Sequence, residues 1–439
     1  MTVFIMKHCI FYLPYELDPS AARARMVSPR KMIQAFRSIG YDVFEITGNA
    51  SERKARIKKC RHQIASGVQF DFMYSEASTM PTLLTEPHHL PTHPFMDFGF
   101  FKYVKKQGIP IGLFYPDIYW KFDSYGEHLP AWKRFFALKN YALDIHEYEK
   151  YLDRFYIPSL QVCDYLQSSR LSEIAEELPP GADNLVIEPK RYENRDFAKD
   201  PLTVFYVGGL GNHYQIGELI AAISQTPNTR LILCCREAEW QVEKPNLENL
   251  LSERIEVIHK SGVELEPYYQ QADLCSLMFK KDIYMGMAKP VKAYEYLAHE
   301  KPVLATKGTG IGEYVEETGI GWTIEYSASA ISKQLKEICV STFALQEKAC
   351  LCTKEKNNNT WESRAKQAAK GLTLTTSEIR GGIRQEIADA RKDESCTLRN
   401  ILEKSGGLLM SEDTKMRRRT FQKFFPLCSV DLTSLPNIL

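Results

Sequence analysis

The sequence predicts an α/β protein with two doubly wound domains that face each other across a cleft. Apolar strand-like runs alternate with amphipathic helical patterns, which is typical of a parallel sheet wrapped by helices. This alternation occurs twice, and a polar, charged stretch at 188–200 separates the two series. The length of 439 residues also exceeds what one ordinary domain needs.

The first half contains five predicted strands and one well-defined helix. The helix is predicted over Pro29 to Gly40, because four apolar residues share one face and glycine stands at the end. Those inward residues are Met32, Ile33, Phe36 and Ile39. The predicted strands are Cys9–Leu13, Tyr41–Thr47, Phe70–Tyr74, Ile109–Tyr115 and Phe155–Ile157.

The second half repeats the pattern from residue 202 onward. We therefore predict a first domain at 1–190, a linker at 191–200, a second domain at 201–374 and an extension at 375–439 that fits neither domain. The predicted strands of the second domain are Leu202–Val207, Leu231–Cys235, Ile255–His259, Leu274–Phe279 and Val303–Thr306.

Composition excludes several classes of protein. Hydrophobic residues make up 44% and charged residues 25%, which is typical of a globular protein, and the net charge of +1 argues against nucleic-acid binding. No apolar run approaches the ~20 residues of a membrane-spanning helix. Residues 1–14 predict a strand, not a signal peptide. The eleven cysteines show no paired metal spacing and are expected to be reduced thiols in a cytoplasmic protein.

The most informative segment runs from Ala288 to Thr306. It predicts a helix that opens at Pro290 and is followed by a buried strand and the glycine-rich turn Gly308–Gly312. The carboxyl edge of a parallel sheet is where ligands bind in such folds. One helix face is apolar and the other can meet a ligand. The apolar face holds Val291, Tyr294 and Ala298, and the charged face holds Lys292, Glu295 and His299.

The run Lys292-Ala-Tyr-Glu-Tyr-Leu-Ala-His-Glu-Lys-Pro-Val303 resembles the nucleotide-sugar signature of bacterial GT-B-fold glycosyltransferases of group 1, the class that makes surface polysaccharides. The resemblance implies two Rossmann-like domains and a late helix, here around Trp361, that returns to the first domain. It also implies that Glu295 holds the donor ribose and that Lys289 or Lys292 stands near the phosphates. A helix amino terminus favours a pyrophosphate on physical grounds as well.

The chain departs from this class at Met287. Many members carry a second glutamate at this position, eight residues before the one that corresponds to Glu295. In those members it contacts hydroxyls of the transferred sugar. Gly286 next to it would still allow a sugar to approach the backbone. Two alternatives therefore stay open: a nucleotide-sugar epimerase of the same fold, and a catalytically silent partner subunit of another transferase.

Two further elements of the second domain are candidate donor contacts. The loop of Gly208, Gly209 and Gly211 follows the first strand, where glycine allows close approach of a phosphate, although the pattern is not G-x-G-x-x-G. Arg236 closes the next strand and is a candidate clamp for the diphosphate. A surface salt bridge from Arg236 to Glu237 or Glu239 is the alternative.

In the first domain, Asp117 is the candidate catalytic residue. It follows a buried strand, and the resemblance places a polar residue there beside the transferred sugar. A plain helix cap is the alternative. The long loop after the third predicted strand offers Glu76 and His89 as candidate acceptor contacts. Its histidines raise a zinc hypothesis, but we predict no metal site because no helical H-x-x-x-H pair is present.

The resemblance implies a retaining, metal-independent transfer from a nucleoside-diphosphate-sugar to a hydroxyl of a glycan or lipid-linked acceptor. The donor is a substrate, and no cofactor is expected. The aromatic and basic run Ala131 to Lys139 could lie on an anionic bilayer, and so could Met416 to Phe425. We therefore expect a cytoplasmic protein with a peripheral contact on the inner face of the plasma membrane. The aromatics of the first run could equally belong to the core.

Overall fold

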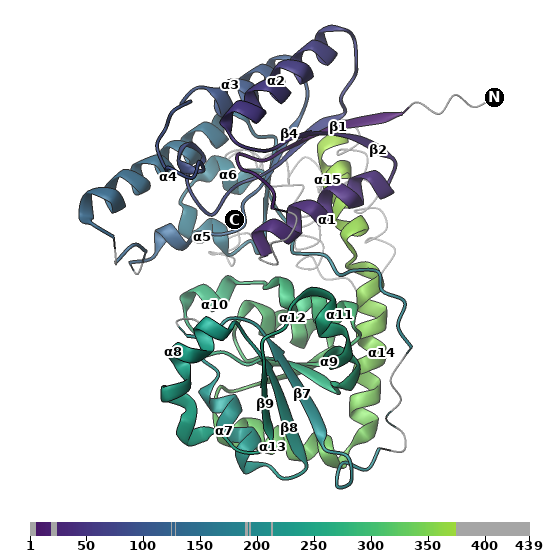
Figure 1. Cartoon of the computed structure of the whole chain (residues 1–439). Coiled ribbons are helices and arrows are strands. Elements are labelled where there is room, and N and C mark those ends of the chain that lie inside the picture. The colour runs from purple at the N-terminus through teal and green to yellow at the C-terminus, as the bar shows by residue number, and fades with distance from the viewer. Residues whose placement is uncertain are drawn as a thin grey trace, which may run out of the picture.

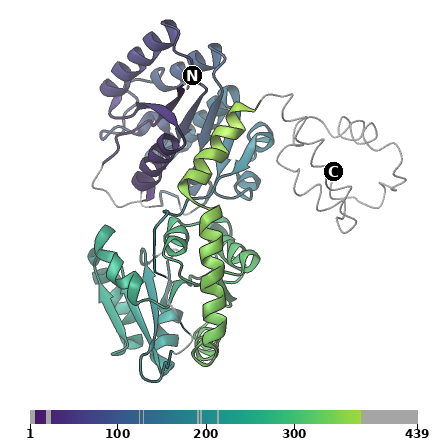
Figure 2. The same cartoon turned by 90° about the vertical axis from the view of Figure 1, so that its right-hand side faces the viewer.

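A computed structural model describes residues 6–18, 24–123, 125–127, 129–188, 192, 195–211 and 214–374. Two α/β domains lie one above the other, and the last helices run along both of them (Figures 1 and 2). The predicted extension at 375–439, with its run Met416 to Phe425, lies outside the described residues, as do positions 191, 193 and 194 of the predicted linker.

The first domain is built on a six-stranded sheet in which all pairings are parallel, with strand order β2-β1-β3-β4-β5-β6. Alternate residues of β1 face opposite sides, and each side carries its own apolar cluster. Helices therefore cover both faces. The strands are β1 Lys7–Tyr12, β2 Tyr41–Ile46, β3 Phe72–Glu76, β4 Ile111–Phe114, β5 Arg154–Ile157 and β6 Ala175–Glu177. The helices are α1 Ala24–Ser38, α2 Ala50–Ala65, α3 Met96–Lys106, α4 Ala131–Tyr151, α5 Val162–Leu166 and α6 Ser169–Glu173, with short 3₁₀ turns η1 Thr82–Leu84 and η2 Tyr119–Lys121.

The second domain repeats this architecture with strand order β12-β11-β10-β7-β8-β9, again all parallel. Its strands are β7 Leu202–Val207, β8 Thr229–Cys234, β9 Ile255–Ile258, β10 Leu274–Leu277, β11 Val303–Thr306 and β12 Gly321–Ile324. Its helices are α7 Gly217–Gln225, α8 Glu237–Leu247, α9 Glu266–Gln271, α10 Ile283–Met287, α11 Val291–Ala298, α12 Gly310–Thr318, α13 Ala328–Val340, α14 Thr342–Asn358 and α15 Trp361–Thr373, with 3₁₀ turns η3 Glu248–Leu250 and η4 Gly262–Leu265.

The predicted fold class is confirmed, and all ten predicted strands are present, two of them with the predicted bounds and eight with shifted ends. The two strands that the sequence pattern missed are β6 and β12, which stand at the edges of their sheets. The first reads Ala-Glu-Glu and lacks the apolar, β-branched pattern of a strand, whereas the second is a run of only four residues that begins with glycine. The predicted helix at 29–40 begins earlier, at Ala24, and ends at Ser38.

The chain returns to the first domain through α14 and α15 (Figure 2). Helix α15 packs against α1 and joins the same apolar cluster as β1. The crossing point is held by backbone hydrogen bonds between Ala182 and the segment 359–361, at 2.7 Å to the carbonyl of Asn359 and 3.2 Å from the N–H of Trp361. The two domains are therefore joined at two places in the chain.

None of the described helices is long and apolar enough to cross a membrane. The described cysteines are free thiols, and most of them are buried.

Gly181 tests this crossing point. A Cβ there would lie 2.6 Å from the backbone nitrogen of Trp361, so Gly181→Ala should destabilise the protein by ~1–3 kcal/mol in urea unfolding. Gly99→Ala in α3 is the matched control, because nothing lies within 4 Å of its added Cβ. Equal stability of the two variants would contradict the tight packing at residue 181.

Candidate functional site

The candidate site lies where the strands of the second sheet end, on the side that faces the first domain. Because all pairings are parallel, the carboxyl ends of β7, β8, β10 and β11 meet at one edge. The glycine loop follows β7, Arg236 follows β8, helix α10 follows β10, and α11 precedes β11. All donor residues predicted for this domain therefore come from one edge of one sheet.

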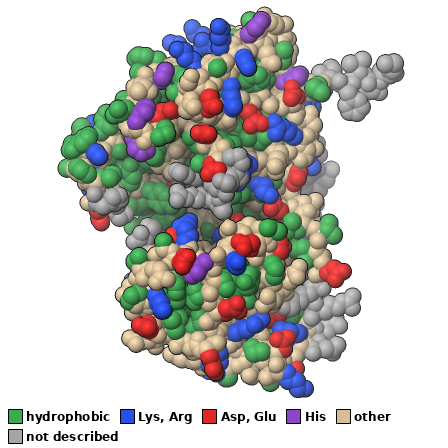
Figure 3. Space-filling view, in the orientation of Figure 1, with side chains coloured by type: hydrophobic (Ala, Val, Ile, Leu, Met, Phe, Trp, Pro, Cys, Tyr) green, Lys and Arg blue, Asp and Glu red, His purple; other side chains and the backbone are tan. Residues whose placement is uncertain are grey.

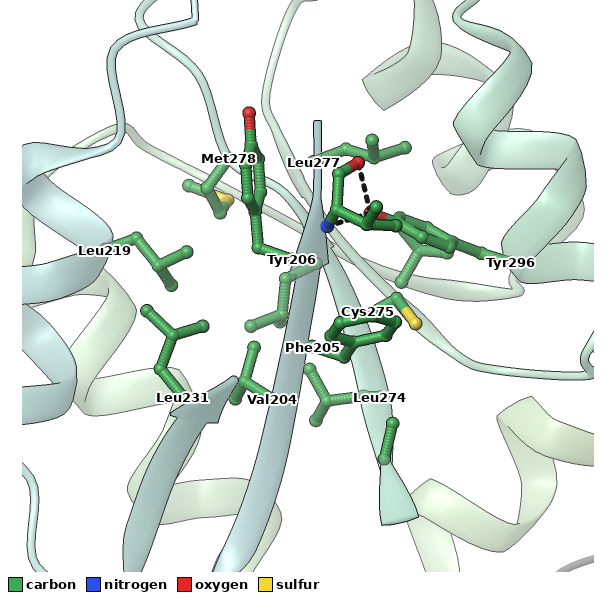
Figure 4. Packing of buried hydrophobic residues seen from close by; sticks show 14 of the residues in the cluster. Val204, Phe205, Tyr206, Leu219, Leu231, Leu274, Cys275, Leu277, Met278 and Tyr296 are labelled. Atoms are coloured by element: carbon green, nitrogen blue, oxygen red, sulfur yellow. Dashed lines mark hydrogen bonds between the residues drawn. The ribbon is translucent and has the colours of Figure 1, made fainter. Parts of the chain in front are cut away.

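Helix α11 is fixed to this edge by Tyr296. Its buried hydroxyl accepts a hydrogen bond from the N–H of Val207 at 3.0 Å and lies 3.3 Å from the carbonyl oxygen of the same residue. Figure 4 shows Tyr296 on one side of β7 and Tyr206 on the other. The predicted buried positions Tyr294 and Ala298 are buried, whereas Val291 is half-buried. Because no side chain caps the helix at Pro290, its first turn can accept a ligand.

The charged face of α11 forms the cluster that the sequence predicts. Lys292 pairs with Glu295, and both side chains are 31% exposed, so the pair can be reached from solvent. The hydroxyl of Tyr269 lies 3.4 Å from the Glu295 carboxylate. His299 stacks on the Tyr269 ring at 3.7 Å between centroids and lies 3.2 Å from the carboxylate of Glu266. Glu295 is thus held in place by a cation and a phenol.

The loop of Gly208, Gly209 and Gly211 needs glycine at residue 211. Gly211 has a φ of 80°, and a Cβ there would lie 2.6 Å from a carboxylate oxygen of Glu243. The carbonyl of Gly209 accepts a hydrogen bond from the Tyr206 hydroxyl at 2.6 Å, which ties the loop to the end of β7. Gly208 begins the loop, and a Cβ there would lie 2.9 Å from that same hydroxyl oxygen.

Arg236 forms an ion pair with Glu239, one of the two alternatives that the sequence left open. Its side chain is 64% exposed. The carboxylate of Glu239 also accepts from the N–H of Leu210 at 3.2 Å, so it connects the arginine with the glycine loop. Arg236 lies beside the loop, as its position after β8 predicts.

The side chain of Lys289 contacts the first domain. It pairs with Glu177, at the end of β6, and its side chain is 16% exposed. Its ammonium also lies 6.0 Å from the ring centroid of Tyr314. Of the two lysines proposed for the phosphates, only Lys292 shares the helix face with Glu295; Lys289 forms a contact between the domains.

Asp117 lies beyond the end of β4 and meets the second domain. Its carboxylate accepts a hydrogen bond from the Tyr284 hydroxyl at 3.0 Å and another from the N–H of Tyr119 at 3.1 Å. The rings of Tyr119 and Tyr284 are stacked at 4.9 Å between centroids. Burial raises the pKa of Asp117 to about 7, although these hydrogen bonds act in the opposite direction. A carboxyl group at the domain interface therefore titrates near neutral pH.

Helix α10 carries two contacts that the sequence did not predict. Tyr284 reaches Asp117 across the interface, and Met287 is buried in the apolar cluster of the first domain. Gly310 packs close to this helix, since a Cβ there would lie 2.8 Å from the carbonyl oxygen of Gly286. At the position where the resembled class has a sugar-contacting glutamate, this chain has a domain contact.

The other two candidates of the first domain, Glu76 and His89, make contacts within that domain. Glu76 ends β3, is 3% exposed, and has the Tyr74 hydroxyl 3.5 Å away. Burial raises the pKa of Glu76 to about 8. The Nδ1 atom of His89 lies 3.0 Å from the carbonyl oxygen of Leu84, which holds the ring against its own loop. Within the described ranges, no three His, Cys, Asp or Glu side chains gather in a way that could hold a metal ion.

Similarity to solved structures defines the class of fold. A structure of WaaG, a glycosyltransferase involved in lipopolysaccharide biosynthesis, is 14% identical with a TM-score of 0.52, covering 83% of this chain and 100% of that one. The catalytic domain of starch synthase IV from Arabidopsis thaliana is 9% identical with a TM-score of 0.55, covering 84% and 99%. A glycosyltransferase from Rickettsia africae is 12% identical with a TM-score of 0.53, covering 84% and 100%. The chain has the GT-B fold.

The family assignment comes from the second domain. Residues 189–349 match the family described as "Glycosyl transferases group 1", and this segment contains the glycine loop, Arg236 and the whole of α11. The second domain therefore matches the group 1 family, and the chain as a whole has the GT-B fold. No curated protein sequence matches it.

Asp117 makes stability depend on pH. Its pKa in the folded protein, about 7, lies above the unfolded value of ~3.9, so the folded state binds more protons between these values and stability falls as pH rises. Asp117→Asn removes this loss, so the variant should gain stability over wild type by on the order of 1 kcal/mol for each pH unit from about pH 4 to about pH 7. Urea unfolding at several pH values measures this. Asp123→Asn, at an exposed position, should show no such change.

Proposed function

We propose that the protein transfers a sugar from a nucleoside-diphosphate-sugar to a hydroxyl of a glycan or lipid-linked acceptor in surface polysaccharide synthesis. The transfer is proposed to retain anomeric configuration and to need no metal ion. The observation that carries the proposal is the uncapped amino terminus of α11, which stands at the carboxyl edge of the second sheet beside the Lys292–Glu295 pair.

The proposed donor site follows from what this edge offers to a nucleoside diphosphate. The free N–H groups of the first turn and the positive end of the helix favour the diphosphate. Lys292 adds a cation in the first turn of the helix, and Glu295 would accept from the two ribose hydroxyls. The Lys292–Glu295 pair is only partly exposed, so a bound ribose would displace little water from it.

Arg236 and Lys289 are proposed to reach the departing diphosphate by exchanging partners. Arg236 pairs with Glu239 on an exposed surface, where an ion pair contributes little stability and can open readily. Lys289 would leave Glu177 of the first domain, which links donor binding to the relative position of the domains. Stabilising the diphosphate as it leaves is the main electrostatic task in such a reaction.

Asp117 is proposed to act at the transferred sugar. It lies at the interface between the domains, where Tyr284 of the donor domain donates to it. Its carboxyl group can orient a sugar hydroxyl or stabilise positive charge at the anomeric carbon once Tyr284 moves aside. Because burial raises its pKa to about 7, its charge at neutral pH would respond to the arrival of a ligand.

The acceptor domain carries the proposed membrane contact. At the start of α4, Trp132 is 68% and Phe135 is 63% exposed, which the core alternative for this run does not account for. Lys133 lies 5.5 Å from the first ring and Lys139 5.5 Å from the second. Aromatic rings beside ammonium groups suit an anionic lipid interface, so a peripheral position on the inner face of the plasma membrane is proposed.

The names of the similar structures support the proposal in outline. WaaG is described as acting in lipopolysaccharide biosynthesis, and the starch synthase structure is bound to ADP and acarbose. Both agree with a nucleoside-diphosphate donor and a growing glycan as acceptor.

The donor site can be tested by the thermal stability of the purified protein with UDP, GDP, ADP, CDP or dTDP. One diphosphate at a hundred times its dissociation constant should add ~2.7 kcal/mol, and Glu295→Ala should abolish the gain. Glu256→Ala, an exposed glutamate on β9, should leave it unchanged.

The outcomes separate the proposal from its rivals. If no diphosphate stabilises the protein, the proposed donor site is wrong. Stabilisation without transfer to any of a broad panel of acceptors would favour a silent partner subunit. Conversion of the donor to an epimer with no acceptor present would favour the epimerase.

A further inference from the structure

The first domain has a groove along helix α2. One wall is helix α2, and the other is the segment that precedes α3; the groove has a volume of about 770 Å³, within the ~300–1,000 Å³ of ligand sites. Three cationic side chains of α2 line the groove. The first two are four residues apart and the last two are three residues apart, so all three share one helix face over ~10 Å. They are Lys54, Lys58 and Arg61.

These cations are available to a ligand. All three are exposed, and none of them forms an ion pair with a carboxylate in the part of the chain that the structure describes. Arg61 lies 4.6 Å from the ring centroid of Tyr103. The nearest acidic residue on the helix, Glu52, is used in the cap, where it accepts from the N–H of Asn49 at 3.0 Å. Figure 3 shows Lys and Arg side chains gathered over this upper edge of the domain.

A buried charge network fixes the second wall against α2. Arg53 is 2% exposed, and its guanidinium donates to Asp97 at 3.1 Å, to Glu86 at 3.1 Å and to the carbonyl of Gly48 at 2.8 Å. The Tyr12 hydroxyl also donates to Asp97. A buried arginine paired with two carboxylates costs several kcal/mol to break by removing one partner. The groove is therefore preformed, with its acidic neighbours already paired.

The second wall is mostly apolar. It consists of His93, Pro94, Phe95 and Met96, and the Phe95 side chain is 85% exposed. An exposed aromatic ring beside a row of cations can stack on the apolar face of a sugar while the cations bind its acidic groups.

We infer that this groove binds an acidic glycan chain, with carboxylate or phosphate groups on Lys54, Lys58 and Arg61 and a sugar ring on Phe95. The groove is concave, so it suits a chain-like polyanion better than a flat lipid surface. It begins with Ser51 in the first turn of α2, at the carboxyl edge of the first sheet, and leads away from that edge. The inference rests on the proposed function in taking this chain to be the acceptor, whose end would enter the site near Asp117.

Binding of an oligogalacturonate to the full chain, measured by calorimetry, tests the inference, with a neutral malto-oligosaccharide of equal length as the reference. Lys58→Glu should weaken binding of the acidic chain by about tenfold, and added salt should weaken it further. Lys59→Glu is the matched control, because it makes the same charge change at an exposed neighbour that does not line the groove. Its affinity should stay within about twofold of wild type. Phe95→Ala should weaken binding without changing its dependence on salt.

Equal binding of the neutral chain would overturn the inference, and so would equal loss in Lys58→Glu and Lys59→Glu. Co-sedimentation with vesicles containing phosphatidylglycerol that depends on Lys58, without binding of the oligogalacturonate, would assign the groove to a membrane instead and overturn it. The nucleotide measurement is independent of these results. A lost diphosphate response with intact groove binding would refute the proposed function and leave the groove as a glycan site.

Discussion

The hydrogen bonds between the Tyr296 hydroxyl and the backbone of Val207 are the contact on which the proposed donor site depends. They join a helix to the end of the central strand of its sheet in a fully buried position, so the helix cannot slide or tilt without leaving a buried polar group unpaired. With α11 fixed in this way, its uncapped first turn and the Lys292–Glu295 face stand next to the glycine loop.

A second constraint couples this edge to the first domain. Helix α10 leads directly into α11, yet Tyr284 donates to Asp117 and Met287 is buried in the first domain's apolar cluster. Lys289, between the two helices, pairs with Glu177. A movement of one domain relative to the other would therefore pull on the segment that carries the donor-binding helix.

The sequence predicted the two-sheet fold and the helix at Pro290 because both depend on local patterns: alternating apolar runs, a helix start and a charged face. It missed β6 and β12 because edge strands pair on one side only and need no strong apolar pattern. It could not find Tyr284, because the contact with Asp117 joins residues 167 positions apart. The ion pairs of Arg53 with Asp97 and Glu86 could not be predicted either, because they join residues 44 and 33 positions apart. The sequence identifies Met287 only by the glutamate that it replaces, whereas the structure shows it buried in the apolar cluster of the first domain.

The central claim is that α11 holds the donor diphosphate. A crystal structure with the stabilising nucleoside diphosphate bound tests it most directly. The account predicts the phosphate oxygens within ~3 Å of the N–H groups of the first turn of α11, with the ribose hydroxyls on the Glu295 carboxylate. A nucleotide bound at any other edge of the second sheet, or with its ribose away from Glu295, would contradict it.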